Sequence, residues 1–229
     1  MNDVIKNYVR ADRRFVEEFS KIGESASIYE VMKQGAMTSD IRPIWPGVRM
    51  CGTALTVKTK TADNLMLHKA IDMSKPGDVI VVDCGEYIES GGMCGGLMAA
   101  SMKMRGAVGI VTNGALRDSL AFKELGMPAY ARALNVKEST KCQKGFINHP
   151  IIVGGVLINP GDIIFGDNDA VVVIPKELAE EALAKAKARE EEEAELERDI
   201  LAGKYTIFEL DYKEKYAALG LTEDEEEEL

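Results

Sequence analysis

A glycine-rich stretch and an Arg-Asp pair are the parts of this sequence that could do chemistry. Residues 91–101 read Gly-Gly-Met-Cys-Gly-Gly-Leu-Met-Ala-Ala-Ser, and Arg117-Asp118 follow an apolar run and Asn113-Gly114. Glycines at a helix start let backbone N–H groups approach a ligand closely, and such groups favour an anion. Arginine can pair with a developing oxyanion, and aspartate offers a hard oxygen ligand to a divalent cation. Together these residue types suit carbon–carbon bond chemistry next to a carboxylate.

Each of these residues also has a purely structural interpretation. Asp118 could cap a helix that begins at Ser119, Arg117 could form a surface ion pair, and a glycine cluster could be a loop without a ligand. Cys94 lies beside the glycines and could be a reactive thiol, but no paired His supports a nucleophile, so a packing role is favoured. His68 has no second ligand spaced with it, which favours packing on a helix face over metal binding.

The glycine stretch and the Arg-Asp pair are expected to lie at one edge of a parallel sheet. Residues 79–83 and 107–112 predict two buried strands, and residues 99–104 predict a helix between them. This is a strand, helix, strand unit. Arg117 and Asp118 then leave a loop after a strand's carboxyl end, where open α/β folds usually place their ligands.

Further helices and strands are predicted around this unit. Expected helices cover residues 4–22, 27–35, 64–71 and 119–125, and expected strands cover residues 54–59, 129–131, 150–153, 156–158 and 169–175. Residues 41–47 carry two prolines and predict a loop. Because helix-linked strands come first and a hairpin-rich set follows, the sequence favours an α/β sandwich over a doubly wound nucleotide-binding fold.

The composition limits the class of protein and the partners. With 229 residues, of which 46% are hydrophobic, the chain can build one sizeable core. A formal net charge of −10 without a dense Lys/Arg cluster argues against a nucleic-acid partner. Four cysteines without CxxC spacing favour reduced thiols over a zinc site or disulfides. No apolar stretch approaches the ~18 residues of a membrane span, so we expect a soluble cytoplasmic protein with no membrane partner.

The composition changes at Lys176. Ala, Glu, Lys and Arg dominate from there to Ala202 and predict one long helix with few apolar residues, of the kind that docks on a neighbouring subunit. A shorter segment follows Gly203, and the acidic residues 223–228 are expected to be disordered. The sequence therefore predicts a core over residues 1–175 and a helical arm with an acidic tail over residues 176–229.

Several motifs taken together resemble the RraA-like family. They are Ile41–Gly47, Asp63–His68, Pro76–Asp83, Gly95–Met98, Asn113–Asp118, Asn159–Asp162 and Asp167–Asp169. The family includes class II pyruvate aldolases that act on 4-hydroxy-4-methyl-2-oxoglutarate and 4-carboxy-4-hydroxy-2-oxoadipate, and shorter regulators that inhibit a ribonuclease. The resemblance implies an α/β/β/α sandwich of the swivelling-domain type, and the C-terminal helical arm resembles the aldolase branch.

The resemblance to the aldolases also implies roles for individual residues. The backbone amides of Gly95-Gly96-Leu97-Met98, which we call the cradle, would hold the pyruvyl carboxylate of a small 2-keto acid substrate. Asp118 would bind Mg²⁺ or Mn²⁺, and Arg117 would bind the substrate and stabilise the pyruvate enolate that carbon–carbon cleavage leaves. Oxaloacetate decarboxylation passes through the same enolate and is expected as a second activity. The family further implies a homotrimer or homohexamer with sites between subunits.

One position departs from the aldolase pattern. Many relatives carry an acidic residue where this chain has Gly96, so a carboxylate that could take part in protonation or position water is missing here. This departure shifts weight toward an alternative function, that of a non-catalytic regulator that binds and inhibits a ribonuclease. Some aldolases use a glutamate from a neighbouring subunit's arm near the metal, and Glu190–Glu193 are the candidates for that role.

Overall fold

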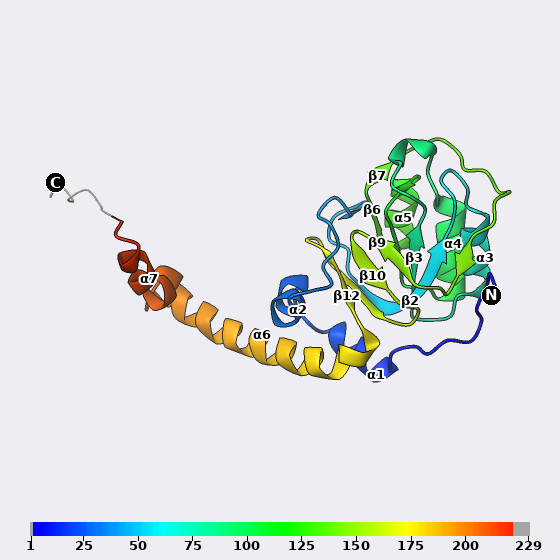
Figure 1. Cartoon of the computed structure of the whole chain (residues 1–229). Coiled ribbons are helices and arrows are strands. Elements are labelled where there is room, and N and C mark those ends of the chain that lie inside the picture. The colour runs from blue at the N-terminus through cyan, green and yellow to red at the C-terminus, as the bar shows by residue number, and fades with distance from the viewer. Residues whose placement is uncertain (1, 222–229) are drawn as a thin grey trace. The chain divides into compact units, whose positions relative to one another are not determined.

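A mixed β-sheet organises the part of the chain that ends at Lys187 (Figure 1). The computed structural model describes residues 2–221. In sheet order the strands are β1 (Arg42–Pro43), β6 (Ala129–Ala131), β4 (Gly109–Thr112), β3 (Asp78–Asp83), β2 (Met50–Lys58), β11 (Ile163–Gly166) and β12 (Val171–Ile174), and β8 (Phe146–Ile147) pairs with β2. β2, β3, β4 and β6 are parallel neighbours, whereas β1, β8, β11 and β12 pair antiparallel. The parallel strands therefore share one carboxyl-end edge.

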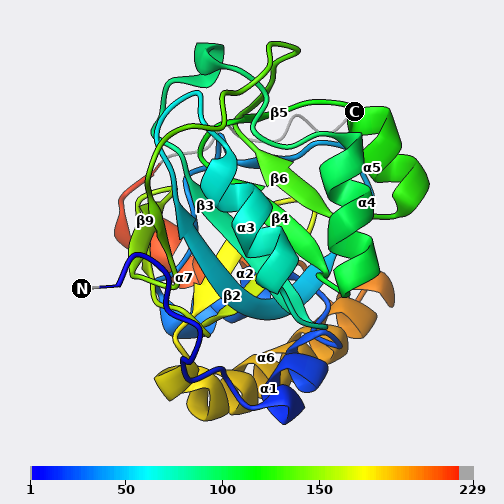
Figure 2. The same cartoon turned by 90° about the vertical axis from the view of Figure 1, so that its right-hand side faces the viewer.

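Helices connect the parallel strands and cover one face of the sheet. α3 (Leu65–Met73) links β2 to β3, α4 (Gly96–Arg105) links β3 to β4, and α5 (Ser119–Leu125) links β4 to β6. Figure 2 shows α3 lying in front of the strands, with α4 and α5 beside it. Buried side chains such as Leu55, Ile80 and Ile110 join the strands to these helices in one core cluster. The predicted strand, helix, strand unit is therefore confirmed.

A β-hairpin covers the opposite face of the sheet. β9 (Ile151–Val153) and β10 (Val156–Ile158) pair antiparallel, and Gly154 and Gly155 supply the positive φ angles that the turn needs. Side chains alternate along each strand, so Val79, Val81 and Val111 face the hairpin while their neighbours face the helices. The arrangement of helices, sheet and hairpin confirms the predicted α/β sandwich.

A second group of helices packs on β11 and β12. It consists of α1 (Arg13–Phe19), α2 (Ser25–Met32) and the first turns of α6 (Ala179–Leu201), which follows the short helix η2 (Lys176–Leu178). From Ala188 onward the chain forms a second unit, with the rest of α6, the π-helical turn η3 (Phe208–Tyr212) and α7 (Lys213–Ala218). The predicted acidic tail lies outside the described residues.

The prediction of a helix over residues 4–22 is wrong for the N-terminal part of this range. Residues 2–11, which we call the N-terminal strap, are held extended by partners far away in the sequence. Ile5 N donates to Ile147 O at 3.1 Å, Ala11 N donates to Gly161 O at 2.9 Å, and Arg10 forms two 3.0 Å contacts with the buried carboxylate of Asp78. The helix begins only at Arg13, after Asp12 has capped it.

Two other local predictions need correction. α2 begins at Ser25 instead of Ser27, because the Asp167 carboxylate accepts hydrogen bonds from Ser25 N at 2.6 Å and Ser25 Oγ at 2.9 Å. β11 was not predicted, although its residues are buried and apolar, because its strand character comes from pairing with β2 and β12 on either side. Among residues 2–221, no helix is long and apolar enough to cross a membrane.

We predict that Asp63→Asn destabilises the fold in a pH-dependent way. The Asp63 carboxylate is fully buried and accepts hydrogen bonds from Leu65 N, Cys142 N, Gln143 N and the Thr140 hydroxyl. Burial acts to raise the pKa of Asp63, but these donors outweigh it and hold the pKa below its usual value. The side-chain amide of asparagine would point its NH2 group at donors that need an acceptor. This should lower the free energy of unfolding by about 1–3 kcal/mol near pH 7.

The pKa shift of Asp63 sets the direction in which stability changes with pH. Because the pKa of Asp63 is lower in the folded state, its stabilisation is complete above about pH 4 and is lost as the pH falls through the folded value. Urea unfolding at a series of pH values should therefore show the wild type and Asp63→Asn converging in acid. Glu124→Gln is the control, because it removes a carboxylate at an exposed position of α5. A stability difference that does not change with pH would contradict the prediction.

Candidate functional site

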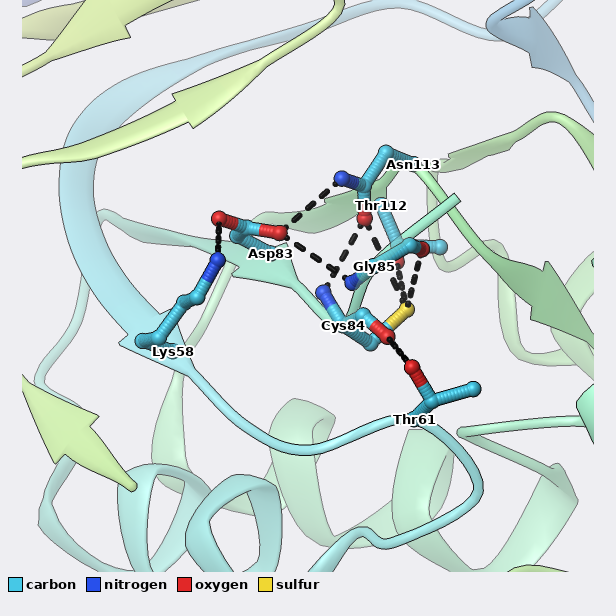
Figure 3. Close-up of polar contacts among 7 residues, drawn as sticks. All are labelled: Lys58, Thr61, Asp83, Cys84, Gly85, Thr112 and Asn113. Carbon is cyan, nitrogen blue, oxygen red and sulfur yellow. Dashed lines mark hydrogen bonds and ion pairs between the residues drawn. The ribbon is translucent and has the colours of Figure 1, made fainter. Parts of the chain in front are cut away.

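The Asp83 carboxylate ties together the ends of three parallel strands (Figure 3). Its Oδ2 pairs with Lys58 Nζ at the end of β2, and its Oδ1 accepts hydrogen bonds from Asn113 Nδ2 at 3.0 Å and Gly85 N at 3.1 Å. Asn113 Oδ1 in turn accepts a hydrogen bond from Cys84 N at 3.0 Å. The loops that follow β3 and β4 are therefore fixed to each other, and they carry the glycine stretch and the Arg-Asp pair.

A short parallel strand pair extends this arrangement. β5 (Ala115–Leu116) pairs with β7 (Ala133–Leu134), and Gly92 forms a parallel bridge to Ala115. The glycine stretch, which comes after the short helix η1 (Ile88–Ser90), runs beside β5: Met93 N donates to Ala115 O at 2.8 Å, and Arg117 N donates to Cys94 O at 3.0 Å. The two predicted parts of the site therefore lie side by side.

The Asp118 side chain caps the N-terminus of α4 and not that of α5, the helix that Asp118 directly precedes. Its backbone is left-handed, with φ at 59°, and its side chain makes no capping hydrogen bond to α5. Its Oδ2 instead accepts a hydrogen bond from Gly96 N, the first residue of α4, at 2.9 Å. A carboxylate at a helix N-terminus is favoured by the helix dipole. The structural interpretation in which Asp118 simply caps α5 is therefore wrong.

Arg117 and Asp118 form a partly exposed charge pair. Arg117 Nε lies 4.0 Å from Asp118 Oδ2, and the two side chains are 40% and 52% exposed. Solvent screens a pair this exposed, so it contributes little to stability. Both groups remain available to a ligand.

Gly95 and Gly96 allow close approaches that a side chain would obstruct. A Cβ at Gly95 would lie 2.5 Å from Asp118 Oδ2 and 3.0 Å from Arg117 Nε, between the two charged groups. A Cβ at Gly96 would lie 3.0 Å from the Cβ of Ala121, so an acidic residue here would press on α5. The departure from the aldolase pattern at Gly96 thus accompanies close packing of α4 on α5.

The cradle is partly used by the chain itself. Gly96 N donates to Asp118, and Met98 N donates to Gly95 O at 3.0 Å within the first turn of α4. The Leu97 side chain points to solvent and is 88% exposed, while Met98 is buried. An internal carboxylate therefore lies at the helix N-terminus where the resemblance implies a substrate carboxylate.

An open cavity of about 510 Å³ lies beside the pair. It is lined by Arg117, Asp118, Ser119, Leu120, Leu134, Asn135 and Val136. Of these, only the first two were predicted as site residues. The others come from α5, β7 and the chain after β7, and their contribution depends on the β5–β7 pairing that sequence patterns do not show.

The site fits a cation that keeps much of its water. Among the described residues, no group of three or more His, Cys, Asp or Glu side chains could hold a metal ion. Asp118 offers one half-exposed carboxylate, which lines the open cavity. Mg²⁺ is commonly held by one or two carboxylates and several waters, which this donor set can provide. His68 is exposed on α3 and belongs to no such group.

Cys94 is not a nucleophile. Burial raises the pKa of its thiol to about 12, the charge of Asp118 adds to the shift, and that of Arg117 opposes it. A thiol with this pKa carries almost no thiolate near neutral pH. The packing interpretation of Cys94 is therefore supported.

Comparison with known proteins places the chain in a family. The family model described as Aldolase/RraA matches residues 25–173. The chain belongs to the aldolase/RraA family. This aldolase/RraA protein is 40% identical over 165 residues to a Halalkalibacterium halodurans protein named as a candidate 4-hydroxy-4-methyl-2-oxoglutarate aldolase, covering 72% of this chain and 78% of the relative.

Solved structures of the family share the fold. RraAS2 of Streptomyces coelicolor, described as an unusual member of the RNase ES inhibitor RraA family, has a TM-score of 0.72 at 25% identity, covering 82% of this chain and 98% of that one. The RNA-processing inhibitor RraA from Thermus thermophilis has a TM-score of 0.62 at 26% identity, covering 67% and 93%. The predicted RraA-like fold is therefore confirmed.

We predict that one of the four cysteines of this aldolase/RraA protein reacts rapidly with Ellman's reagent. All four are free, but Cys142 is exposed, Cys51 is half-buried, and Cys84 and Cys94 are buried. At about pH 8 the native protein should show one fast thiol, mapped to Cys142 by mass spectrometry, and four after unfolding. Fast labelling of Cys94 would restore it as a candidate nucleophile.

Proposed function

We propose that this protein is a divalent-metal-dependent pyruvate aldolase. The substrate is a 4-hydroxy-2-keto acid such as 4-hydroxy-4-methyl-2-oxoglutarate, which is cleaved to pyruvate and a second keto acid. The observation that carries this proposal is the pairing of Arg117 with Asp118 against the glycine-opened N-terminus of α4, beside an open cavity. The name of the H. halodurans relative supports the same activity.

The roles of the two charged residues follow from their chemistry. Asp118 would hold Mg²⁺ or Mn²⁺, and the cation, when bound, supplies Lewis-acid polarisation of the 2-keto group. Arg117 pairs with the negative charge that develops on the enolate oxygen, so its contribution is largest in the transition state. The backbone amides at the start of α4 would orient the pyruvyl carboxylate through the positive end of the helix.

The bond changes in the reaction are balanced without another reactant. The C3–C4 bond breaks and its electron pair becomes the enolate of pyruvate. The C4 hydroxyl gives its proton to a base as the new carbonyl forms, and the enolate carbon takes up a proton to give pyruvate. Asp118 is the one carboxylate among the cavity-lining residues, so a water molecule is the expected base. In oxaloacetate the same bond breaks with release of CO₂ and gives the same enolate, so we propose decarboxylation as a second activity.

We also propose an assembly of three or six copies. The Ala188–Leu229 unit contains acidic residues in α6, and Glu190–Glu193 are the candidates for reaching a neighbouring copy's site. A glutamate supplied in this way would compensate for the carboxylate missing at Gly96.

A second candidate function is that of a regulator that binds and inhibits a ribonuclease. It is favoured by the glycine at position 96 and by the structural relatives described as RNase ES or RNA-processing inhibitors. A regulator needs neither a metal at Asp118 nor turnover, so a single activity assay distinguishes the two functions.

The deciding experiment measures pyruvate release by the purified full chain. The substrates are 4-hydroxy-4-methyl-2-oxoglutarate and oxaloacetate, each with Mg²⁺, Mn²⁺ or EDTA. Release that requires metal and stops with EDTA supports the aldolase, and the two rates rank the substrates. Absence of release from either, by protein with an intact assembly, favours the regulator.

We predict that Asp118→Asn and Arg117→Ala lose turnover without loss of fold. Asparagine tolerates the left-handed backbone at position 118 but gives up the charged ligand. Arg117→Ala should lower kcat by about 10²–10³-fold, as loss of one stabilising group for a developing oxyanion does. Glu124→Gln and Lys123→Ala on exposed positions of α5 are the matched controls. An Arg117→Ala enzyme that changes only KM would argue against enolate stabilisation.

We further predict that Asp118→Asn binds pyruvate more tightly than the wild type when metal is absent. The wild-type carboxylate sits on Gly96 N and 4.0 Å from Arg117 Nε, so it competes with an incoming anion for both groups. Removing its charge should tighten binding in EDTA by about fivefold or more. Ligand-observed NMR titration with pyruvate measures the change, and Glu124→Gln is the control. Weaker binding by the variant would show that Asp118 does not compete.

A further inference from the structure

Part of the lining of the site cavity is apolar and exposed. Leu120 is 66% exposed on α5, Leu134 is 53% exposed at the end of β7, and Val136 is 86% exposed just after it. We call these three side chains the apolar rim. Single exposed apolar residues are ordinary, but three around one cavity that also holds two catalytic candidates mark a surface that receives a ligand.

The backbone under the rim is held firmly. Leu134 pairs with Leu116 in the β5–β7 ladder, and Asn135 N donates to Leu116 O at 2.8 Å. The Asn135 side chain donates to Ile88 O at 3.0 Å and accepts from Lys137 N at 3.0 Å. Because its polar side chain is engaged in these bonds, Asn135 contributes little polarity to the cavity.

Positive charge near the cavity is scarce. Arg117 is the single cation among the lining residues, and Asp118 offsets it. The nearby Lys137 is engaged by Glu89, with Nζ at 3.1 Å from its backbone oxygen and 3.3 Å from Oε2. A carboxylate placed against the rim would lose water without gaining a cationic partner, which is unfavourable.

We propose that the apolar rim selects substrates by the group attached to C4. It receives a methyl or similarly small apolar group and disfavours a carboxymethyl group at the same place. This inference rests on the proposed function and adds the residues that set its substrate class. The enzyme then prefers 4-hydroxy-4-methyl-2-oxoglutarate to 4-carboxy-4-hydroxy-2-oxoadipate, which differ in that group.

The test compares kcat/KM for these two substrates in the full-length wild type and in Val136→Lys and Leu134→Lys. The wild type should favour the methyl substrate by about tenfold or more, within the range for a small apolar pocket that meets a mismatched group. Each lysine should shift the ratio toward the carboxymethyl substrate by about tenfold, because it supplies a charge partner. Both positions are exposed, so the fold tolerates lysine there.

Leu157→Lys is the matched control. Leu157 is an exposed leucine of β10, on the hairpin that covers the other face of the sheet, so its substitution changes the net charge equally without touching the cavity. Its substrate ratio should stay at the wild-type value. Size-exclusion chromatography of every variant reports whether the rim is instead covered by a second copy of the chain.

The outcomes separate this inference from the proposed function. If the ratio of kcat/KM values shifts only in the two rim variants and the assembly is unchanged, the proposed role of the apolar rim is supported. Equal cleavage of both substrates by the wild type, or unchanged ratios in the rim variants, overturns it while the aldolase function stands. A changed assembly with unchanged ratios overturns it in favour of a subunit interface. No pyruvate from either substrate overturns both.

Discussion

The buried carboxylate of Asp83 is the constraint on which the candidate site depends. Parallel strands bring their carboxyl ends to one edge, but the loops that leave them are free to diverge. Asp83 prevents this by bonding to Lys58, Asn113 and Gly85, so that the ends of β2, β3 and β4 are joined. These contacts of Asp83 therefore set the relative position of the glycine stretch and the Arg-Asp pair. Their role is structural, and no contact of Asp83 with a ligand is needed to explain them.

The second determinant of the site is an internal competition. The N-terminus of α4 offers amides that suit an anion, and the nearest anion is Asp118 of the chain itself. If Asp118 is also the metal ligand, as proposed above, the two binding events are linked, because drawing its carboxylate toward a cation would free the Gly96 amide for the substrate. A Cβ at Gly95 would lie 2.5 Å from Asp118 Oδ2, so glycine at this position allows the carboxylate to approach the start of α4 this closely.

Sequence patterns predicted the local parts of this molecule and missed the parts made by distant contacts. The apolar run of β3 and the helix and turn residues around α4 and α5 are local signals, and all three elements are present. The helix expected at the N-terminus failed because Asp78, Ile147 and Gly161 hold residues 2–11 extended. The residues of the site were predicted through the family resemblance, but the direction of the Asp118 side chain was not, since it depends on a left-handed backbone angle. The apolar rim depends on the β5–β7 pairing and left no local pattern.

The N-terminal strap has a consequence for how the chain is made. Its residues are synthesised well before their partners, because Ile5 bonds to Ile147 and Ala11 bonds to Gly161. These bonds cannot form until their partner residues, 142 and 150 positions further along the chain, have been synthesised. The strap therefore closes late, over a sheet whose strands β2, β3 and β4 have already been translated. Arg10 then forms its two 3.0 Å contacts with the Asp78 carboxylate at the start of β3.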